Sequence, residues 1–205
     1  MTTARIAAPQ NERSRRTRAA VLDATWELLE AQGPRAVTMA AVADRAGVSR
    51  RGLYLHFPSR AELLLAVHAH IDERLDLASS IRPILEASDS VTALEEFVAH
   101  LARYHPKIGR IDTALLASTD DPEVAELVER GAGQWQEGCR TIARRLADEH
   151  RLAAPWTVDT AADLLWSFMF PETLERLTRQ RRWSLRRYTE HLTVLLRRAL
   201  VTDPD

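Results

Sequence analysis

The 205-residue sequence predicts an all-α fold of about nine helices, with a small three-helix head at the N-terminus and a larger helical body after it. Apolar residues recur at intervals of three and four, and glycine or proline separates the segments that carry them. No segment alternates with the period of two that a half-buried strand requires. Serine, threonine or aspartate precedes several segments at the N-cap position.

The first predicted helix starts near residue 15 and ends at Gly33-Pro34. Residues 1–14 lack periodicity and are predicted to form a flexible basic arm. Arg16 and Arg18 crowd the start of the helix, where positive charge opposes the helix dipole. These arginines therefore need another partner, or they belong to a run of charge that faces solvent.

Residues 38–60 are the most informative stretch of the chain. Thr38 is predicted to cap a short helix that Gly47 ends, and Ser49 is predicted to cap a second one. In the second helix, Leu53 and Phe57 form an apolar stripe only one side chain wide. The opposite face carries groups that donate to phosphates or base edges and build no core. These residues are Arg50, Arg51, Gly52, Tyr54 and His56.

Two short helices joined by a glycine turn, the second with a cationic face, are typical of a helix-turn-helix, here at 38–57. Directly before such a motif, Arg16 and Arg18 are interpreted as contacts to the DNA backbone or minor groove in preference to solvated charge.

A fourth helix is expected after Pro58, because Ser59 and Glu62 have the spacing of a capping box, and it is expected to run to about Ser79. The head then comprises residues 15–75 and the body residues 76–205. His68 and His70 lie on this helix two residues apart, so their side chains point to different faces. No metal site is expected from them.

The body is predicted to be helical throughout. One helix covers 91–104 and ends before Pro106, and a shorter one covers 108–117. Asp121-Pro122-Glu123 starts a helix that reaches about residue 149, and three glycines within it predict a bend or a close packing contact. Pro171 must interrupt the next helix, and Ser184 opens the last one.

Composition and charge fit a globular protein with a basic head. Apolar residues make up 45% and charged residues 28%, and neither a membrane span nor a signal-peptide pattern is present, so a cytoplasmic location is expected. Residues 1–70 carry a net charge of +4 and the remainder −5. A basic head on an acidic body favours binding of nucleic acid through the head alone. The lone cysteine, Cys139, is interpreted as a small buried apolar side chain.

Residues 38–60, TMAAVADRAGVSRRGLYLHFPSR, resemble the DNA-binding segment of the tetracycline-repressor (TetR) family of bacterial transcriptional regulators. The resemblance extends back through Val21-Leu22-Asp23-Ala24 and Gly33 and covers about 60 residues. Asp121-Pro122-Glu123, the stretch 162–166 and Pro171-Glu172 resemble the body of such proteins more loosely. Arg51 and Gly52 depart from the family pattern, which has small residues or Thr, Ser or Ala there.

The resemblance implies a homodimer that binds a double-stranded, palindromic DNA operator and is released by a small-molecule effector. It also implies that Arg60, in place of the usual Lys, reaches a phosphate. The residues expected to contact DNA are Arg16, Arg18, Thr38, Ser49, Arg50, Arg51, Gly52, Tyr54, His56 and Arg60.

For the body, the resemblance implies a ligand cavity lined by Phe97, Leu101, Tyr104, Trp135, Trp166 and Met169. Aromatic and Met residues at helical spacing are more often plain core, so both interpretations are open. The last two helices are expected to pair with those of a second subunit, although burial within one chain explains their apolar stripes equally well. The residues of this seam would be Leu164, Phe168, Leu174, Leu177, Tyr188, Leu192, Leu195 and Ala199.

No catalytic constellation, cofactor motif or pair of histidines at ligand spacing is found, so neither an enzyme nor a cofactor is expected. The alternative hypothesis is a helical ligand-binding or scaffold dimer with weakened or non-specific DNA binding. The sequence does not identify the effector, the operator or the regulated genes, nor does it separate repression from activation.

Overall fold

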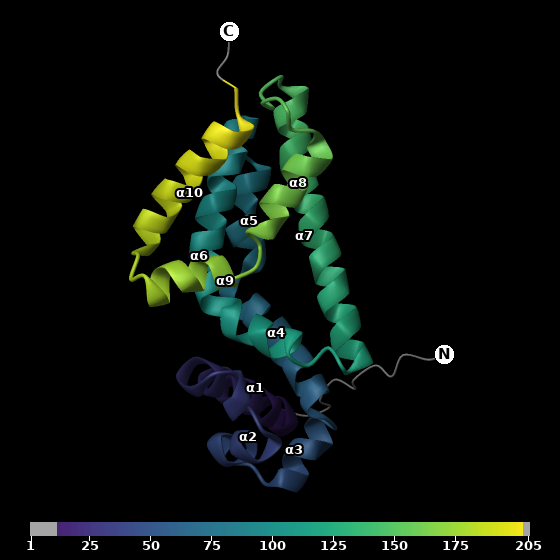
Figure 1. Cartoon of the computed structure of the whole chain (residues 1–205). Coiled ribbons are helices and arrows are strands. Elements are labelled where there is room, and N and C mark those ends of the chain that lie inside the picture. The colour runs from purple at the N-terminus through teal and green to yellow at the C-terminus, as the bar shows by residue number, and fades with distance from the viewer. Residues whose placement is uncertain (1–11, 203–205) are drawn as a thin grey trace, which may run out of the picture. The chain divides into compact units, whose positions relative to one another are not determined.

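The structure, a computed structural model, describes residues 12–202, and most of the predicted flexible arm lies outside that range. The predicted all-α fold is confirmed: ten α-helices occur in residues 12–202, and β-pairing there is limited to one isolated bridge between Leu152 and Val201 (Figure 1). The chain divides into two compact units, one of residues 12–74 and 110–125, the other of 75–109 and 126–202.

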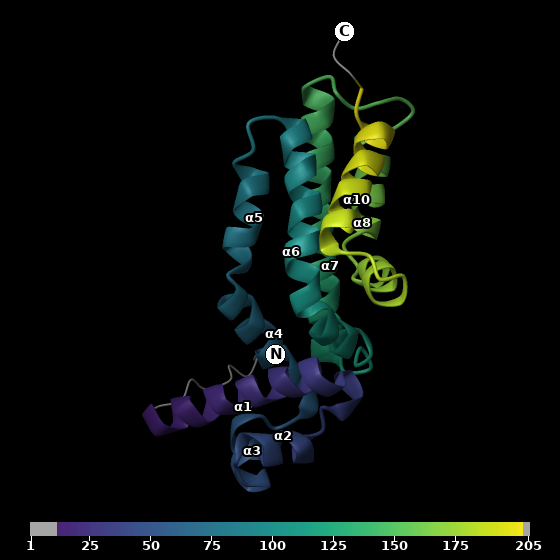
Figure 2. The same ribbon diagram turned by 90° about the vertical axis from the view of Figure 1, so that its left-hand side faces the viewer.

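Besides residues 110–125, which include parts of two later helices, the first unit contains four helices and a short 3-10 turn. They are α1 (Glu12–Gln32), η1 (Pro34–Ala36), α2 (Met39–Ala46), α3 (Arg50–His56) and α4 (Arg60–Leu75). Figures 1 and 2 show α1 alongside α2 and α3. The core between these helices is built from side chains with almost no exposure: Val21, Leu29, Val42, Leu53, Phe57, Leu63 and Val67. Burying each large apolar side chain contributes roughly 1.5–3 kcal/mol.

Helix α4 is shorter than the sequence analysis predicts. The expected run to about Ser79 is wrong, because Asp76 adopts a left-handed conformation (φ 49°) and interrupts the helix. The Asp76 carboxylate accepts a hydrogen bond from the Ser79 amide at 3.1 Å and so caps a separate helix, α5 (Leu77–Leu85). Hydrogen bonds from the Ser79 hydroxyl and from this amide lower the pKa of the Asp76 carboxyl.

Helix α6 (Ser90–Leu116) runs straight through the residue that was expected to end it. The prediction of two helices separated at Pro106 is wrong. Proline in a helix interior costs about 3 kcal/mol because it removes one backbone hydrogen bond and crowds the preceding turn. Leu101 and Ile108, on either side of Pro106, are both buried, and their packing keeps the helix continuous.

Helix α7 (Pro122–Asp148) begins where the sequence predicts. The Asp121 carboxylate accepts from the amide of Glu123 at 3.0 Å, which is the expected N-terminal cap. Of the two alternatives predicted at the glycines of this helix, a bend or a close packing contact, the close contact is wrong. Apart from the neighbouring backbone of the helix itself, no atom lies within 4 Å of a Cβ built at any of them. These residues are Gly131, Gly133 and Gly138.

In the last part of the chain, one helix ends before Pro171 and another begins after Ser184, as the sequence predicts. Helix α8 (Val158–Ser167) ends before Pro171, and α9 (Glu172–Glu175) continues into a π-helical turn, η2 (Arg176–Gln180). Helix α10 (Leu185–Leu200) starts after Ser184, whose hydroxyl accepts from the Arg187 amide at 3.1 Å. Figure 2 shows α6, α7, α8 and α10 as a bundle, with α5 at its edge next to α6.

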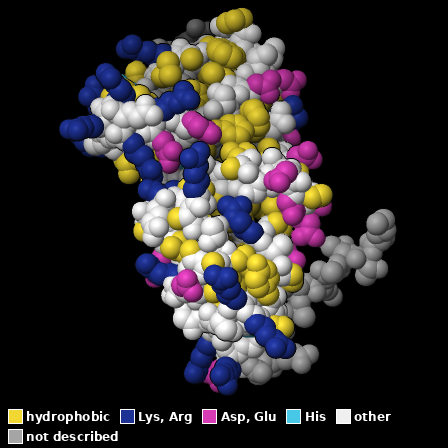
Figure 3. All heavy atoms as spheres, turned by 60° about the horizontal axis from the view of Figure 1, so that its bottom comes forward, with side chains coloured by type: hydrophobic (Ala, Val, Ile, Leu, Met, Phe, Trp, Pro, Cys, Tyr) yellow, Lys and Arg dark blue, Asp and Glu magenta, His cyan; other side chains and the backbone are white. Residues whose placement is uncertain are grey.

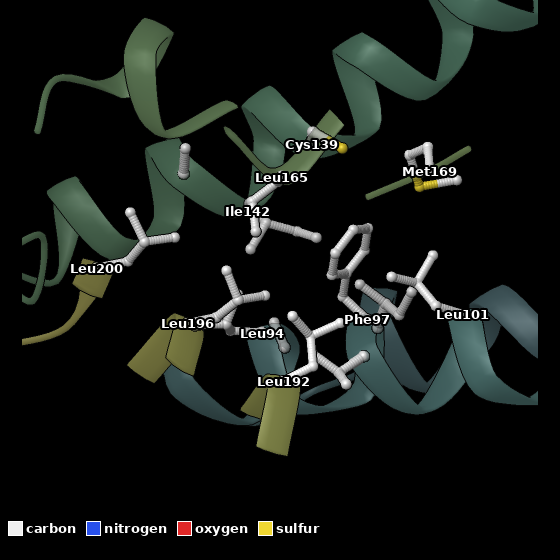
Figure 4. Packing of buried hydrophobic residues seen from close by; sticks show 14 of the residues in the cluster. Leu94, Phe97, Leu101, Cys139, Ile142, Leu165, Met169, Leu192, Leu196 and Leu200 are labelled. Atoms are coloured by element: carbon white, nitrogen blue, oxygen red, sulfur yellow. The ribbon is translucent and has the colours of Figure 1, made fainter. Parts of the chain in front are cut away.

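One apolar cluster fills the interior of this bundle. Figure 4 shows the Phe97 ring among leucines and isoleucine from four helices, including Ile142 of α7, Leu165 of α8 and Leu192 of α10. Cys139 is 1% exposed in the same cluster, and burial raises the pKa of its thiol to about 12. The interpretation of Cys139 as a small buried apolar side chain is therefore confirmed.

Candidate nucleic-acid interface

Helix α2 has the ends that the sequence predicts. The Thr38 hydroxyl accepts from the Ala41 amide at 3.1 Å, which satisfies one of the free donors at the helix start. Gly47 ends the helix at φ 65°, a conformation that side chains with a Cβ disfavour. The amide of Val48 then donates to the Ala43 carbonyl at 3.0 Å and turns the chain towards α3.

Helix α3 is fixed on its inner face and open on its outer face. The Ser49 hydroxyl accepts from the Gly52 amide at 3.0 Å, and Leu53 and Phe57 are both fully buried. The outer face presents Arg50, Arg51 and Tyr54, with Tyr54 49% exposed. Figure 3 turns this end of the first unit towards the viewer, and Arg side chains lie among apolar ones there, with few acidic groups between them.

Leu55 also belongs to the outer face of α3 and is missing from the predicted site. Its side chain is 77% exposed, the largest exposed fraction among the large apolar residues reported for residues 12–202. A signal for it existed in the sequence, because a residue two positions after Leu53 points away from the face that Leu53 buries. An exposed leucine beside cations offers an apolar surface for a partner.

Arg50 and Arg51 have no carboxylate partner in the described part of the chain. Neither side chain makes an ion pair within residues 12–202, whereas Arg45 binds the Glu27 carboxylate at 2.9 Å and Arg16 pairs with Glu12 in the first turn of α1. Both α3 arginines are exposed, so their positive charge is available to an anionic partner.

Arg18 lies against α3. Its guanidinium carbon is 4.4 Å from the centroid of the Phe57 ring, and Nη1 donates to the His56 carbonyl at 3.4 Å. Burial lowers the pKa of Arg18, while Glu62 opposes that change. Arg18 thus holds the C-terminal end of α3 by a cation–π contact and a hydrogen bond.

Arg60 is bonded within its own unit. Nε donates to the Val37 carbonyl at 2.9 Å, and Nη1 donates to the Ser118 hydroxyl at 2.9 Å. The third nitrogen, Nη2, lies 3.5 Å from the Pro34 carbonyl. The guanidinium therefore already has oxygen acceptors for all three of its nitrogens.

His68 and His70 contact separate carboxylates. His70 Nε2 lies 2.8 Å from Asp23 Oδ1 and thereby links α4 to α1. His68 Nδ1 lies 3.3 Å from Asp72 Oδ2. The side chains diverge as the two-residue spacing predicts.

The six residues predicted to line a ligand cavity are largely part of the core of the second unit. Phe97, Leu101, Tyr104 and Met169 are buried, whereas Trp135 and Trp166 are half-buried, with Trp166 Nε1 donating to the Ala132 carbonyl at 3.2 Å. A groove of about 470 Å³ lies elsewhere on this unit, between α6 and α10. It is lined by Ala99, Ala102, Arg103, Pro106, Lys107, Leu185, Arg186 and Thr189.

Two buried histidines accompany the predicted aromatic residues and were missed by the sequence analysis. His100 stacks against Tyr104 and Trp135, with ring centroids 5.4 and 5.5 Å away, and its Nδ1 lies 2.9 Å from the Ser80 hydroxyl. Burial lowers the pKa of His100 and of His105 to about 4, with Arg103 adding to the effect on His100. His100 occurs three residues after Phe97 and four before Tyr104, a helical spacing that could have indicated its burial.

The residues predicted for a dimer seam fall into two groups. Leu174, Tyr188 and Leu192 are buried within a single chain. The others reach the surface of the second unit to different extents: Leu195 is 54% exposed, and Leu164, Phe168, Leu177 and Ala199 are half-buried. Asp163, which precedes Leu164, is exposed and accepts from Gln136 at 3.4 Å.

No helix within residues 12–202 has the length and apolar character needed to cross a membrane.

Comparison with known proteins places this geometry in a family. The profile of the tetR family of bacterial regulatory proteins matches residues 21–67, which contain α2 and α3. The transcriptional activator FasR of Mycolicibacterium smegmatis is 31% identical over 156 residues, covering 66% of this chain and 67% of FasR. The nucleoid occlusion factor SlmA of Alteromonas mediterranea is 33% identical over 146 residues, covering 67% of this chain and 72% of SlmA.

Solved structures have the same fold. A transcriptional regulator from Saccharomonospora viridis, solved in complex with choline, superposes with a TM-score of 0.78 at 16% identity and covers 92% of this chain and 100% of its own. At that identity the likeness concerns the fold alone. Together with the capped α2–α3 motif and the two curated relatives, it shows that the chain belongs to the tetR family of bacterial DNA-binding transcriptional regulators.

Proposed function

We propose that the chain is a homodimeric repressor that binds a palindromic operator through α3 and releases it when a small molecule binds the second unit. The observation that carries the proposal is the outer face of α3, where Arg50, Arg51 and Tyr54 are exposed. A rigid inner face, with Leu53 and Phe57 buried, supports the role of α3 as the helix that enters the major groove.

Each side chain of this face has a chemical role in the proposal. Arg50 and Arg51 donate to phosphates or to guanine O6 and N7, and Tyr54 donates to a phosphate or packs on a base edge. Arg16 and the amide end of α2 beside Thr38 contact the backbone, where positive charge and free N–H groups favour phosphate. His56 and Gly52 complete the surface, and Leu55 adds an apolar contact.

Dimerisation follows from the limited number of base pairs that one α3 can read. Symmetric dimers read two half-sites about 34–36 Å apart, so the operator is proposed to be a palindrome. The residues proposed for the dimer surface are those of the predicted seam that reach the surface of the second unit: Leu164, Phe168, Leu177, Leu195 and Ala199.

The effector is proposed to be a small organic molecule bound by the second unit. The Saccharomonospora viridis regulator of the same fold was solved in complex with choline, which supports a small-molecule effector for this chain without naming it. Trp135 and Trp166, both half-buried, are the predicted lining residues that a ligand reaches with the least rearrangement. A cytoplasmic location, with access to the chromosome, is part of the same proposal.

The test is titration of purified protein against a labelled palindromic fragment from the region upstream of its own gene. We expect saturable binding whose log K falls linearly with log salt, because phosphate contacts release counterions. Arg50→Ala and Tyr54→Ala should each weaken specific binding about tenfold or more, the range of a lost base contact. Dimerisation, measured by light scattering, should not change.

Arg144→Ala is the matched control, because it removes an exposed arginine of α7 whose ion pair to Glu137 is long, at 3.9 Å. Its DNA affinity should equal that of the wild type. Equal affinity for operator and random DNA would instead favour a ligand-binding or scaffold dimer with non-specific DNA binding. Unchanged affinity in both α3 variants would remove α3 from the interface.

A further inference from the structure

We infer that Arg60 is a positioning residue that ties the start of the helix-turn-helix to the end of α6 through Ser118, and that it does not contact phosphate. All the groups involved belong to the first unit, in which residues 110–125 pack with residues 12–74. The inference rests on the proposed DNA-binding function only for its affinity measurement.

The guanidinium of Arg60 is already occupied by acceptors of its own unit. Arg60 Nε donates to the Val37 carbonyl at 2.9 Å, and Nη1 donates to the Ser118 hydroxyl at 2.9 Å. The Ser118 hydroxyl in turn donates to the Ala114 carbonyl at 2.7 Å. To bind a phosphate, Arg60 would have to leave the acceptors at Val37 and Ser118, and hydrogen bonds from a charged group are among the stronger ones in proteins.

Arg60 binds two buried residues, one at the start of the helix-turn-helix and one after the end of α6. Val37 is the residue before Thr38, the N-cap of α2, and its side chain is 1% exposed. Fixing the Val37 carbonyl therefore fixes the point at which the chain enters the motif. Ser118 lies two residues after the end of α6, is 6% exposed, and is held by its own bond to Ala114. The fork of Arg60 joins these two points and sets their separation.

A second arginine attaches the same segment to α1. Arg110 Nη1 donates to the Leu29 carbonyl at 3.0 Å, which also accepts from the Gly33 amide at 2.9 Å. The positive charge of Arg110 interacts favourably with the negative, C-terminal end of the α1 dipole. Gly33 has φ 81°, a left-handed conformation that suits glycine, and this turn leads into η1 and α2. The end of α6 is thus joined to the first unit at both Leu29 and Val37.

Lysine cannot replace Arg60 in this role. A planar guanidinium presents donors in fixed directions to two acceptors, whereas a lysine ammonium is a single point of charge. Lys at this position would serve a phosphate contact as well as Arg, but would not span both the Val37 carbonyl and the Ser118 hydroxyl. The two hypotheses for Arg60 therefore predict opposite results for Arg60→Lys.

The experiment compares Arg60→Lys, Arg60→Met and Ser118→Ala in the full-length protein, with Thr119→Ala as control. Thr119 is exposed, and its hydroxyl bonds only the nearby Leu116 carbonyl at 3.3 Å. Two measurements are made at a temperature where every variant is more than 99% folded: hydrogen exchange of the amides of residues 36–41, and the salt dependence of operator affinity.

We expect Ser118→Ala and Arg60→Lys each to raise the exchange rates and to weaken operator binding several-fold, with the salt slope of the wild type. The double variant Arg60→Met with Ser118→Ala should lose less operator affinity than the two single variants predict together, because the two groups act through one contact. A role in stability alone would leave the affinity of the folded protein unchanged. Thr119→Ala should match the wild type in both measurements.

Three results would overturn the inference. The first is normal binding by Arg60→Lys together with a salt slope reduced by about 1 in Arg60→Met, which would make Arg60 a phosphate contact. The second is unchanged affinity in Ser118→Ala. The third is unchanged exchange in all three variants. If the wild type binds no operator, the proposed function fails, and the exchange measurement alone decides whether Arg60 holds the start of the motif.

Discussion

The two units of this protein are stabilised in different ways. In the first, side chains bond the ends of short helices: Ser49 caps α3, Thr38 caps α2, and Arg60 binds the Val37 carbonyl. In the second, long helices bury one apolar cluster in which Phe97 is 2% exposed. The cationic residues of α3 are accordingly exposed on a short capped element, while the aromatic residues of the body are buried or half-buried. The following predictions test this difference.

The largest effect is expected in the core of the second unit. Phe97→Ala should lower the free energy of unfolding of that unit by about 3–5 kcal/mol, because it leaves a cavity among Ile142, Leu165 and Leu192. Urea unfolding followed by hydrogen exchange of α6 and α7 amides measures it. Leu195→Ala, at a 54% exposed position, is the control and should change monomer stability by less than about 0.5 kcal/mol.

A loss below about 1 kcal/mol for Phe97→Ala would contradict the single buried cluster. It would instead suit a body with space around Phe97, as the ligand-cavity hypothesis requires.

Acid should weaken the second unit before the first. His100 and His105 titrate near 6.5 when unfolded and at about 4 when folded, so the unfolded chain binds more protons between these values. Stability is therefore complete above about pH 6.5 and falls towards pH 4, by on the order of 3 kcal/mol for each histidine. Chemical denaturation at several pH values measures the slope.

His105→Gln should reduce that slope, because it removes one of the two buried imidazoles. His150→Asn is the control, since His150 is exposed and asparagine tolerates its left-handed φ of 54°. Exchange in α2 and α3 should vary less with pH over the same range. A pH slope equal in both units would contradict the assignment to His100 and His105.

The same difference explains what the sequence could predict. The ends of α2, α3, α7 and α10 depend on residues three positions apart, so capping rules located them correctly. Continuation of α6 past Pro106 depends on burial of side chains such as Leu101 by residues distant in the sequence, which no local rule contains. For the same reason, the burial of Tyr188 within one chain was not distinguished from a dimer seam.

The candidate site was predictable for residues whose direction the helix period sets. Arg51 lies two positions before Leu53 and Tyr54 one position after it, so the helix period turns both away from the buried face, and the structure exposes them. Arg50, three positions before Leu53, is exposed as the first residue of α3. The bonds from Arg60 to Val37 and Ser118 join residues 23 and 58 positions apart, and the sequence offered no signal for the second.

Removing a helix cap should lower stability by a similar amount in either unit, but it should affect operator binding only in the first unit. Ser49→Ala and Ser184→Ala each delete a hydroxyl that accepts from a helix amide, at 3.0 and 3.1 Å, and each should cost about 1 kcal/mol. Only Ser49→Ala should also weaken operator binding, because α3 carries the proposed DNA contacts, whereas Ser184 lies at the opposite end of α10 from the proposed dimer residues Leu195 and Ala199. Thermal unfolding and DNA titration measure the two effects, and equal affinity for both variants would contradict the assignment of α3.

The smallest effect is expected at Gly52, where two contributions oppose each other. Alanine in a helix interior is favoured over glycine by roughly 1 kcal/mol. Against this, a Cβ at Gly52 would lie 3.2 Å from the Ser49 hydroxyl oxygen, so that oxygen must move by a few tenths of an ångström. Ser49 is exposed and its hydroxyl accepts from the Gly52 amide, so it can rotate slightly and keep this bond.

We therefore expect Gly52→Ala to stabilise α3 by about 0.5 kcal/mol, measured as slower exchange of α3 amides. The double variant Ser49→Ala with Gly52→Ala is the control, because without the hydroxyl the full gain of roughly 1 kcal/mol should appear relative to Ser49→Ala alone. Destabilisation by Gly52→Ala in the presence of Ser49, but not in its absence, would mean that the Ser49 hydroxyl cannot move away from the added Cβ. Glycine would then be required at this position by the hydroxyl of Ser49.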